Sequence, residues 1–570
     1  MIGVNPRLFL LALLALQSFL APAMAQTPVV SAPSPVFTRY AVAAANPLAA
    51  EAGLAVLKRN GSAIDAAIAV QMVLNVVEPQ ASGIGGGGLL LYWDAKARKL
   101  HAYDGRETAP KSATPDLFMS DGKPMGFREA VVSAKSVGVP GALRLLHMVH
   151  RAHGRLPWAS LFDPAIALAR DGAPIQRRLA NALAGESALQ NDPAARALFF
   201  DGDGKPRKLG EMLANPALAA VLEKIAADGA DTLYRGDLAQ AIVDAVNRRT
   251  AGTMSLADLA DYAAKEREPV CAPYRVWQVC GFPPPSSGGI AIAQALGILE
   301  QFDMAKLAPN SPAAAHFILE ANRLAFADRN RYVADGDFVS VPLKGLLDRA
   351  YLRERAQLIS PEKAMADVAP GKVQQGAIPP AGISPQLPGT SHMAIVDGEG
   401  NVLSFTTTIE AVFGARLMVQ GFLLNNELTD FSFLPERDGQ KIANQVEPGK
   451  RPRSSMSPTI VFDRDGKPVL AIGSAGGATI IGATLKTIIG VLDWQMPVQQ
   501  AIDLPNLWNV SGASDYEATL GSEEIVKALR NLGHAALPIR QESGLHGIRI
   551  GAHGMDGGAD PRRDGAARGE

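Results

Sequence analysis

The sequence predicts an α+β protein in which layers of β-sheet are covered by helices. Strand patterns form two groups, around residues 87–107 and 391–475, and helical patterns stand before and after both groups. Grouped strands next to grouped helices favour sheets that pack together with helices over their outer faces. No motif recurs every 20–50 residues, so a repeat architecture is not predicted.

Two helices and a hairpin are expected first. Residues 46–61 repeat apolar positions at three- and four-residue spacing and end at Gly61. Residues 63–79 are apolar on almost every side, which is typical of a deeply buried helix. The stretch 87–107 reads as two strands that turn at Ala95-Lys96-Ala97.

Helical segments dominate residues 138–264, and "PPPSSGG" at 283–289 breaks the chain before another buried helix. Residues 359–388 lack periodicity and are rich in Pro, Gly and Gln, which predicts a long loop. After this loop we expect strands in "SHMAIVD", "VLSFTTTI", "FLLNNEL", "SPTIVFD" and "VLAIGSA". Helices are then expected in "GATLKTIIGVLDW" and "EEIVKALRNLG", and the closing "DPRRDGAARGE" is expected to be a polar tail.

Composition narrows the class of function. The chain has 570 residues, of which 47% are apolar and 19% charged, so a large core is available. The formal net charge is −1, which gives no basic surplus for nucleic acid or anionic lipid. This balance suits an enzyme that acts on small molecules.

The N-terminus predicts export. Residues 1–25 combine Arg7, an apolar run over 8–16 and the small-x-small sequence Ala23-Met24-Ala25. We expect a signal peptide over 1–25, a mature chain that begins at Gln26, and a periplasmic or secreted protein without a stable membrane span. An uncleaved anchor is the alternative, although the apolar run is short for a span.

The chain has two cysteines, Cys271 and Cys280, on either side of a predicted turn. An oxidising compartment permits a disulfide between them, but the sequence does not give their separation, so the pairing stays open. Two cysteines alone do not make a zinc site, and no other metal-ligand cluster is present in the sequence.

Two glycine-rich stretches suggest sites where the backbone approaches a ligand. Residues 82–90 match G-x-G-x-x-G, but a helix precedes them and a strand follows, which is the wrong order for a dinucleotide site. Residues 473–481, "GSAGGATII", connect a strand to a helix. Such a turn aims N–H groups into a concavity, as an oxyanion hole requires, although the residues alone favour a plain strand-to-helix turn.

"GTSH" places Thr390 at the start of a predicted strand, directly after Gly389. A hydroxyl is a weak nucleophile unless a base takes its proton. If the chain is cut between Gly389 and Thr390, the new α-amine, with a pKa of about 7.7–8.0, becomes that base. The alternative is an ordinary hairpin with a polar entry.

Eight ordered motifs give the chain a resemblance to the γ-glutamyltranspeptidase (glutathione hydrolase) family of N-terminal-nucleophile hydrolases. The motifs are "AAEAGLAVLKRNGSAIDAAIAVQMVLNVVEPQASGIGGGG", "DGRETAP", "PPPSSGG", "GTSH", "LLNNELTDFS", "KRPRSSMSPTIV", "GSAGG" and "DPRRDG". The resemblance implies a four-layer αββα sandwich and self-cleavage into a large subunit, 26–389, and a small subunit, 390–570.

The resemblance also implies the site residues. Thr390 corresponds to the nucleophile, Thr408 to a threonine beside it, and Gly476 and Gly477 to the oxyanion-hole pair. Arg106 corresponds to the arginine that binds the α-carboxylate of the donor, an arrangement that suits the guanidinium fork. Ser454 and Ser455 match the hydroxyls that assist it. Asp430 matches the carboxylate that binds the α-ammonium group, and Glu427 lies at a neighbouring position of that subsite.

Two departures from the family leave the acyl donor open. Glu410 stands where many members have asparagine, which adds negative charge at the ammonium subsite. The stretch 430–454 is shorter than in members with a full lid loop, which predicts a more open cleft. The resemblance therefore implies an exported, self-processing enzyme, without cofactor or metal, that transfers γ-glutamyl groups from glutathione-like donors to water or amines. A glutaryl-type cephalosporin acylase is the close alternative, and an unprocessed binding homologue is a more distant one.

Overall fold

The computed structural model describes residues 36–373, 380–382, 389–510, 512–540 and 542–570. The predicted signal peptide, residues 26–35 and parts of the predicted loop over 359–388 therefore lie outside the described residues. Among the described residues, no helix is long and apolar enough to cross a membrane.

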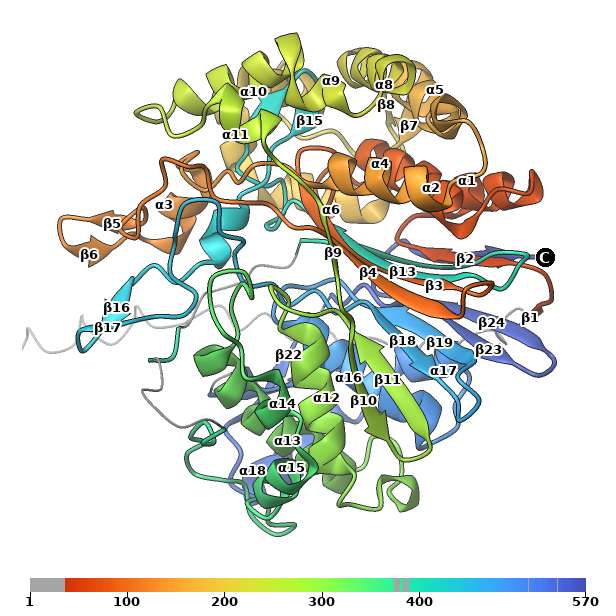
Figure 1. The fold of residues 1–570 in the computed structure, drawn as a ribbon, viewed down its shortest axis with the longest axis vertical. Helices are drawn as coiled ribbons and strands as arrows, with labels where there is room; N and C mark the ends of the chain where they lie inside the picture. The colour runs from red at the N-terminus through yellow and green to blue at the C-terminus, as the bar shows by residue number, and fades with distance from the viewer. Residues whose placement is uncertain (1–35, 374–379, 383–388, 511, 541) are drawn as a thin grey trace, which may run out of the picture.

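The described chain forms four layers, with two sheets packed face to face between two layers of helices (Figure 1). This arrangement confirms the αββα sandwich. Within the described residues each large sheet has seven strands, and every neighbouring pair in it is antiparallel.

The first sheet brings together strands from both ends of the chain. Its order is β25 (Ala566–Gly569), β2 (Ala41–Ala44), β12 (Ser391–Val396), β13 (Val402–Thr408), β3 (Gly87–Asp94), β4 (Lys99–Gly105) and β9 (Lys265–Arg267). The second sheet has the order β1 (Val36–Phe37), β24 (Gly554–Ala559), β23 (His546–Gly551), β19 (Pro468–Gly473), β18 (Thr459–Phe462), β11 (Trp277–Gly281) and β10 (Val270–Tyr274).

Alternating side chains of β12 serve two different cores. Met393 and Ile395 pack toward the helices above the first sheet. Ala394 and Val396 point the other way, into the core between the two sheets. Since side chains of a strand alternate between faces, a strand covered on both sides is expected to be apolar at both sets of positions, as this one is from Met393 to Val396.

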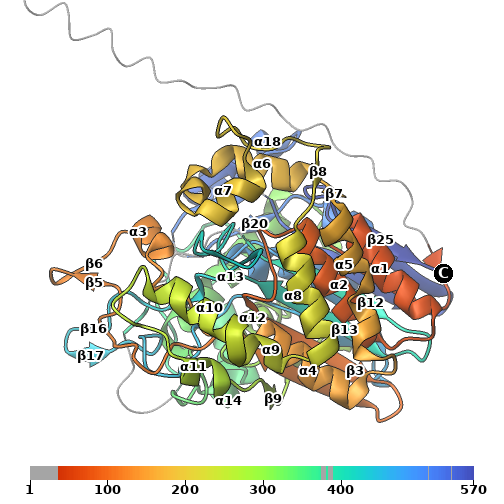
Figure 2. The same cartoon turned by 90° about the horizontal axis from the view of Figure 1, so that it is seen from above.

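One helical layer covers the first sheet, as Figure 2 shows from above. Its helices are α1 (Pro47–Lys58), α2 (Ala63–Val77), α4 (Ala142–His153), α5 (Asp163–Asp171), α8 (Pro216–Asp228), α9 (Asp231–Tyr234) and α10 (Gly236–Asn247). All residues of α2 are buried, because it lies between the sheet and the outer helices. The predicted buried helix is thereby confirmed.

The other helical layer covers the second sheet. Its helices are α12 (Gly288–Leu299), α13 (Pro312–Tyr332), α15 (Arg349–Ala356), α16 (Thr479–Leu492), α17 (Val498–Asp503) and α18 (Ser522–Asn531). The remaining helices of the described chain are α3 (Phe127–Val132), α6 (Arg177–Gly185), α7 (Pro193–Phe199), α11 (Leu256–Ala260) and α14 (Leu343–Leu346), with the 3-10 helices η1 (Trp158–Leu161), η2 (Ser187–Asn191) and η3 (Met304–Lys306). The short strands outside the two large sheets are β5 (Met119–Ser120), β6 (Lys123–Pro124), β7 (Ala173–Pro174), β8 (Met212–Leu213), β14 (Met418–Val419), β15 (Phe422–Leu423), β16 (Glu436–Arg437), β17 (Gln440–Lys441), β20 (Leu507–Trp508), β21 (Ser514–Glu517) and β22 (Ala536–Ile539).

The expected polar C-terminal tail is wrong. Residues Ala566–Gly569 form β25, the edge strand beside β2, and the backbone oxygen of Glu570 accepts hydrogen bonds from the N–H groups of Thr38 and Arg39. Backbone pairing and small side chains hold this strand, and neither leaves an apolar pattern in the sequence.

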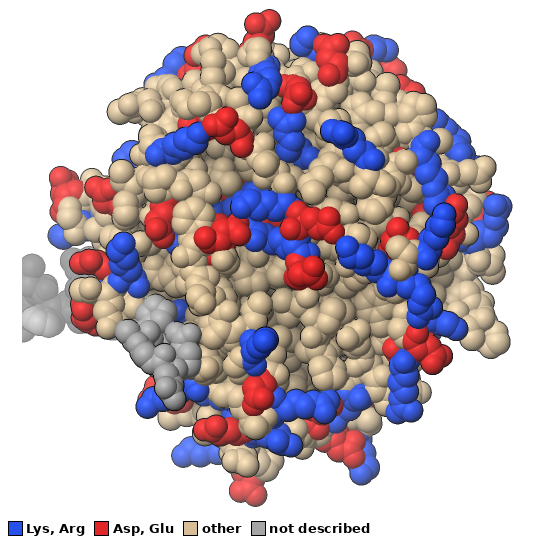
Figure 3. Space-filling view, viewed as in Figure 1, with Lys and Arg blue, Asp and Glu red and all other residues tan. Residues whose placement is uncertain are grey.

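The structure also settles the extent of one expected strand and the pairing of the two cysteines. The "FLLNNEL" stretch is a strand only at Phe422–Leu423, after which the chain enters the short 3-10 helix η4 (Glu427–Asp430). Cys271 and Cys280 lie directly opposite each other on β10 and β11 and form a disulfide. On the face shown in Figure 3, positive and negative side chains are interspersed and form no large basic patch.

Candidate active site

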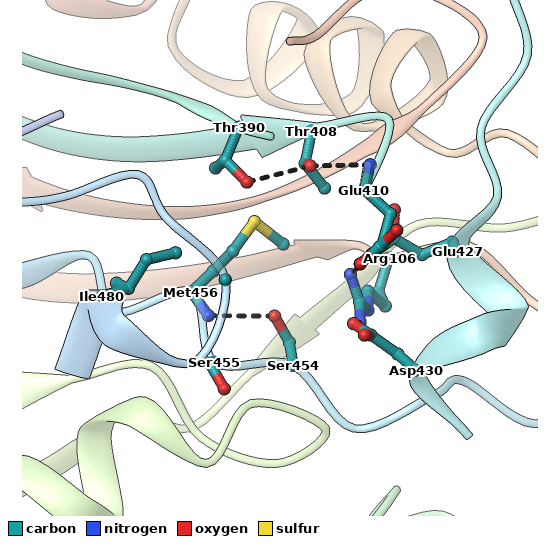
Figure 4. Close-up of a pocket in the computed structure, with 11 residues that line it drawn as sticks. Arg106, Thr390, Thr408, Glu410, Glu427, Asp430, Ser454, Ser455, Met456 and Ile480 are labelled. Carbon is teal, nitrogen blue, oxygen red and sulfur yellow. Dashed lines mark hydrogen bonds and ion pairs between the residues drawn. The ribbon is translucent and has the colours of Figure 1, made fainter. Parts of the chain in front are cut away.

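Thr390 and Thr408 stand at the same end of two adjacent central strands. Thr390 directly precedes β12, Thr408 ends β13, and the register pairs Ser391 with Thr407. The hydroxyl oxygens of the two threonines lie 3.0 Å apart (Figure 4). The N–H group of Glu410 donates to Thr408 Oγ1 at 2.8 Å, which fixes the orientation of that side chain.

The Gly389–Thr390 junction is tightly confined. A Cβ atom at Gly389 would lie 1.8 Å from the carbonyl oxygen of Glu410, so only glycine fits there. Thr390 has φ +78°, a left-handed conformation that is strained for a β-branched residue. The Thr390 N–H donates to the Ala81 carbonyl at 3.2 Å, and its carbonyl accepts from Arg563 Nη1 at 2.9 Å. These contacts hold a strained peptide unit in one position.

Gly476 and Gly477 turn the chain from β19 into α16. Their φ angles are +133° and +63°, which side chains rarely permit, so the turn requires glycine at both positions. Gly477 lines the same cavity as Thr390. The N–H groups of such a turn and the positive end of the α16 dipole favour negative charge, which is the requirement for an oxyanion hole.

Arg106 lies just after β4, at the side of the cavity opposite the threonines, and is almost fully buried. Its guanidinium donates to Glu427 through Nη1 and to Asp430 Oδ2 at 2.5 Å through Nη2. It also donates to the carbonyls of Pro452 at 3.1 Å and Arg453 at 3.2 Å. Of the five N–H groups of an arginine, these bonds use four and leave one on Nη1.

Charge in this cluster is set by burial and by close pairing. Burial disfavours the Arg106 cation, but Glu427 and Asp430 outweigh it and hold the pKa of Arg106 above its ordinary value. Burial raises the pKa of Glu427 to about 7, against the opposing effect of Arg106. Arg106 is therefore charged at neutral pH, whereas the pKa of Glu427 lies close to neutral pH.

Ser454 and Ser455 form the wall next to Arg106, and Figure 4 shows their side chains pointing to opposite sides. Ser454 Oγ accepts a hydrogen bond from the Met456 N–H at 3.0 Å. Ser455 Oγ accepts from Arg329 Nη2 at 2.6 Å, behind the wall. Ser455 thus joins the cavity wall to a buried arginine on α13.

Glu410 is held at the cavity by Asn426. The Asn426 side-chain amide donates to Glu410 Oε2, and its Oδ1 accepts from the Ala411 N–H at 3.0 Å. Glu410 has φ +72°, so its backbone too is in the left-handed region. Together with Glu427 and Asp430 it gives the cavity three carboxyl groups around one arginine.

The structure gathers nearly all the predicted site residues into one small cavity. Its lining includes Arg106, Thr390, Thr408, Glu410, Glu427, Asp430, Ser454, Ser455 and Gly477. Gly476 is the adjacent turn residue and is not part of the lining. In the part of the chain that the structure describes, no group of acidic, His or Cys side chains is arranged to hold a metal ion.

Sequence reasoning did not single out four residues at this site. Met456 and Ile480 line the cavity, Asn426 fixes Glu410, and Arg563 holds the carbonyl of Thr390. Met456 and Arg563 lie inside the motifs "RSSMSP" and "DPRRDG", which was the available signal. Asn426 and Ile480 also lie inside quoted stretches, "LLNNELTDFS" and "GSAGGATII", but their roles follow only from their contacts.

Comparison with known proteins identifies the family. The family model described as Gamma-glutamyltranspeptidase matches residues 49–570. A glutathione hydrolase proenzyme of Bacillus subtilis is 40% identical over 506 residues, which cover 86% of this chain and 84% of the relative. An acylase proenzyme, ACY 1, of Pseudomonas sp. strain SE83 is 36% identical over 539 residues, 93% of each chain.

Among solved structures, the cephalosporin acylase of Bacillus halodurans matches with a TM-score of 0.84 and 28% identity, covering 97% of this chain and 98% of that one. The chain belongs to the gamma-glutamyltranspeptidase family, and the resemblance found in its motifs is confirmed.

Proposed function

We propose that this member of the gamma-glutamyltranspeptidase family is a self-processing γ-glutamyl hydrolase and acyltransferase with Thr390 as its nucleophile. The observation that carries the proposal is one cavity that contains the Thr390 and Thr408 hydroxyls, 3.0 Å apart, together with Arg106, Asp430 and the glycine turn. Relatives that match most of the chain are named glutathione hydrolase proenzymes.

Maturation cuts the chain between Gly389 and Thr390. Thr390 Oγ attacks the Gly389 carbonyl, its proton passes to the Thr390 nitrogen as the peptide bond breaks, and an ester forms. The α-amine of Thr390 is free at this point, and water then hydrolyses the ester, which frees the Gly389 carboxylate and the Thr390 hydroxyl. The strained φ of Thr390 supports the proposal, because cleavage relieves the strain at this bond. The products are subunits 26–389 and 390–570.

The cavity suits a donor that carries both an α-carboxylate and an α-ammonium group. Arg106 offers an N–H on Nη1 that no described residue accepts, and Ser454 contributes a hydroxyl at the cavity wall. Asp430, Glu427 and Glu410 supply negative charge for the ammonium group. Since Arg106 is already paired to two carboxylates, the donor carboxylate joins an existing ion cluster instead of a bare cation.

Acyl transfer then follows from the positions of the groups. The Thr390 α-amine takes the hydroxyl proton while Oγ attacks the γ-carbonyl of the donor. The N–H groups at Gly476 and Gly477 receive the developing oxyanion. The amine leaves with a proton, and water or an acceptor amine attacks the Thr390 ester to give free glutamate or a new γ-glutamyl amide, with the Thr390 hydroxyl regenerated.

A second candidate is an acylase for donors without an α-ammonium group. The relative named acylase ACY 1 and the cephalosporin acylase structure favour it, because both match almost the whole chain. Three carboxyl groups in the cavity oppose it, because a glutaryl donor offers them no positive charge.

Two experiments test the proposal. A denaturing gel of the purified protein shows whether it is cleaved into two subunits, as the proposed enzyme would be, or remains one chain, as an unprocessed binding protein would. Hydrolysis of γ-glutamyl and glutaryl anilides, which differ only in the α-amine, then separates the two enzyme candidates. For residues 1–25 we retain the proposal of an export signal, which N-terminal sequencing of the large subunit checks.

A further inference from the structure

Glu107 follows Arg106 directly, is fully buried and has no part in the reaction described above. Its carboxyl group lies against β3, where a Cβ atom on Gly87 would come within 2.3 Å of Glu107 Oε2. On its other side lies Glu427, which Arg106 binds and which lines the cavity, close enough for the two carboxyl charges to interact. Glu107 therefore forms a second layer behind the residues that line the donor pocket.

Glu427 Oε1 accepts a hydrogen bond from Arg106, but the other three oxygens of the two carboxyl groups, both of Glu107 and Oε2 of Glu427, lack a donor among the described residues. A buried acceptor without a donor is unfavourable, and two ionised carboxylates in contact repel each other strongly. One proton held between the two groups removes both difficulties, as in other carboxyl pairs that share a proton.

We propose that Glu107 carries a proton at neutral pH, donates it in a hydrogen bond to Glu427 Oε2, and so makes binding of an α-ammonium donor depend on pH. Glu107 is a positioning residue in this scheme, since it acts through Glu427 and does not touch the donor. The inference rests on the proposed function, because it concerns the ammonium subsite of that reaction.

The surrounding charges support this assignment. Arg106 balances one of the two charges of Glu427 and Asp430, which leaves these three groups with a net charge of −1, whereas an ionised Glu107 would add a further −1 behind them. Burial, together with the charge of Glu427, raises the pKa of Glu107 well above its ordinary range. The other titratable groups facing the pair are Tyr234 and Tyr262, whose pKa burial raises, and Glu410 across the cavity.

The sign of the pH dependence follows from Glu427. Burial raises the pKa of Glu427 to about 7, so below this pH the pair holds two protons and Glu427 is neutral. Arg106 then loses one ionic partner and the donor ammonium loses one attractive charge. Donor KM is therefore expected to rise as pH falls through about 7, whereas groups that act only in the chemical step change kcat.

The test compares Glu107→Gln with Glu107→Met in the processed protein. Both fill the volume of Glu107, but only glutamine donates an N–H to Glu427 Oε2. With a γ-glutamyl anilide, Glu107→Met is expected to move the acid limb of the KM profile upward by about one pH unit, which weakens donor binding about fivefold at pH 7. Glu107→Gln is expected to restore the limb to its wild-type position.

Equal profiles for the two variants, or a wild-type KM that is flat between about pH 6 and pH 8, would overturn the inference. Infrared spectroscopy supplies a readout that needs no activity. At pH 8 the wild type is expected to show the C=O stretch of a protonated carboxyl group that Glu107→Gln lacks. If the wild type lacks this band, the inference is overturned, whether or not the protein cleaves a γ-glutamyl donor. Failure to cleave a γ-glutamyl donor, by contrast, contradicts only the proposed function.

Discussion

The hydroxyl oxygens of Thr390 and Thr408 lie 3.0 Å apart, at the same end of two paired central strands. Thr408 Oγ1 also accepts the N–H of Glu410, so one hydroxyl connects the proposed nucleophile to a carboxyl-bearing residue of the cavity. The strand pair is buried on both faces, which gives the nucleophile rigid support.

Cleavage should depend on the Thr390 hydroxyl. The wild type is expected to give fragments of about 38 and about 19 kDa, in proportion to 364 and 181 of the 570 residues that weigh 59.9 kDa. Thr390→Ala removes the attacking oxygen and should remain one chain on a denaturing gel. Thr390→Ser keeps a hydroxyl and serves as the matched control that still cleaves.

N-terminal sequencing of the small fragment makes this prediction sharper. The expected start is Thr-Ser-His-Met, from residues 390–393. Any other start removes Thr390 from the role of nucleophile, as would normal cleavage of the Thr390→Ala protein.

Gly389→Ala should slow cleavage without removing any reactive group. The added Cβ would lie 1.8 Å from the Glu410 carbonyl oxygen, so the scissile peptide has to move. A displacement of about 1 Å at a reacting centre costs on the order of a hundredfold in rate. The measurement is the time course of fragment formation, with Gly398→Ala, at an exposed turn with more space, as the control. Cleavage at the wild-type rate would show that the confinement of Gly389 is unimportant.

The layered fold was predictable because its central elements leave strong patterns. The hairpin over residues 391–408 and the buried helix over 63–77 are apolar at the positions that two neighbouring layers require. The C-terminal strand was not predictable, since Ala566–Gly569 joins the sheet through its backbone. This backbone pairing depends on the position of β2 in the folded protein, which cannot be predicted from the sequence of residues 566–569 alone.

The site was predictable only in part for a related reason. Thr390 was suggested by chemistry, since a nucleophile with its own amine needs only one residue. Arg106, Asp430 and Ser454 are far apart in the sequence, so only the family resemblance placed them together. The roles of Asn426 and Glu107 depend on contacts across the fold, and no spacing rule identifies such contacts.

Removal of the last five residues, Ala566–Glu570, should destabilise the protein. This segment pairs with β2, and the Glu570 carboxylate accepts a hydrogen bond from Tyr40 Oη at 2.6 Å. Its loss exposes the backbone of β2 as a new sheet edge. The check is the midpoint of thermal unfolding, which should fall by several degrees. An unchanged midpoint would mean that β25 contributes no stability.

Arg106→Lys should weaken donor use while cleavage continues. Lysine keeps the charge but cannot hold Glu427, Asp430 and a donor carboxylate in the fixed geometry of a guanidinium. We expect kcat/KM for a γ-glutamyl anilide to fall at least tenfold. Arg128→Lys, at an exposed position, is the control. Unchanged activity would mean that Arg106 does not bind the donor.

Glu410→Asn should narrow the preference for donors that carry an α-ammonium group. At about 4 Å and an effective dielectric constant near 20, one charge contact is nominally worth about 4 kcal/mol. Desolvation reduces this to about 1–2 kcal/mol, or roughly tenfold in kcat/KM. The measurement is the ratio of kcat/KM for γ-glutamyl and glutaryl anilides, for the wild type, for Glu410→Asn and for the exposed control Glu129→Gln. The wild type and the control should prefer the γ-glutamyl donor equally, and Glu410→Asn less so, because Asn426 then holds a neutral amide in place of a carboxylate. A wild type that prefers the glutaryl donor would reverse the choice of substrate and favour the acylase.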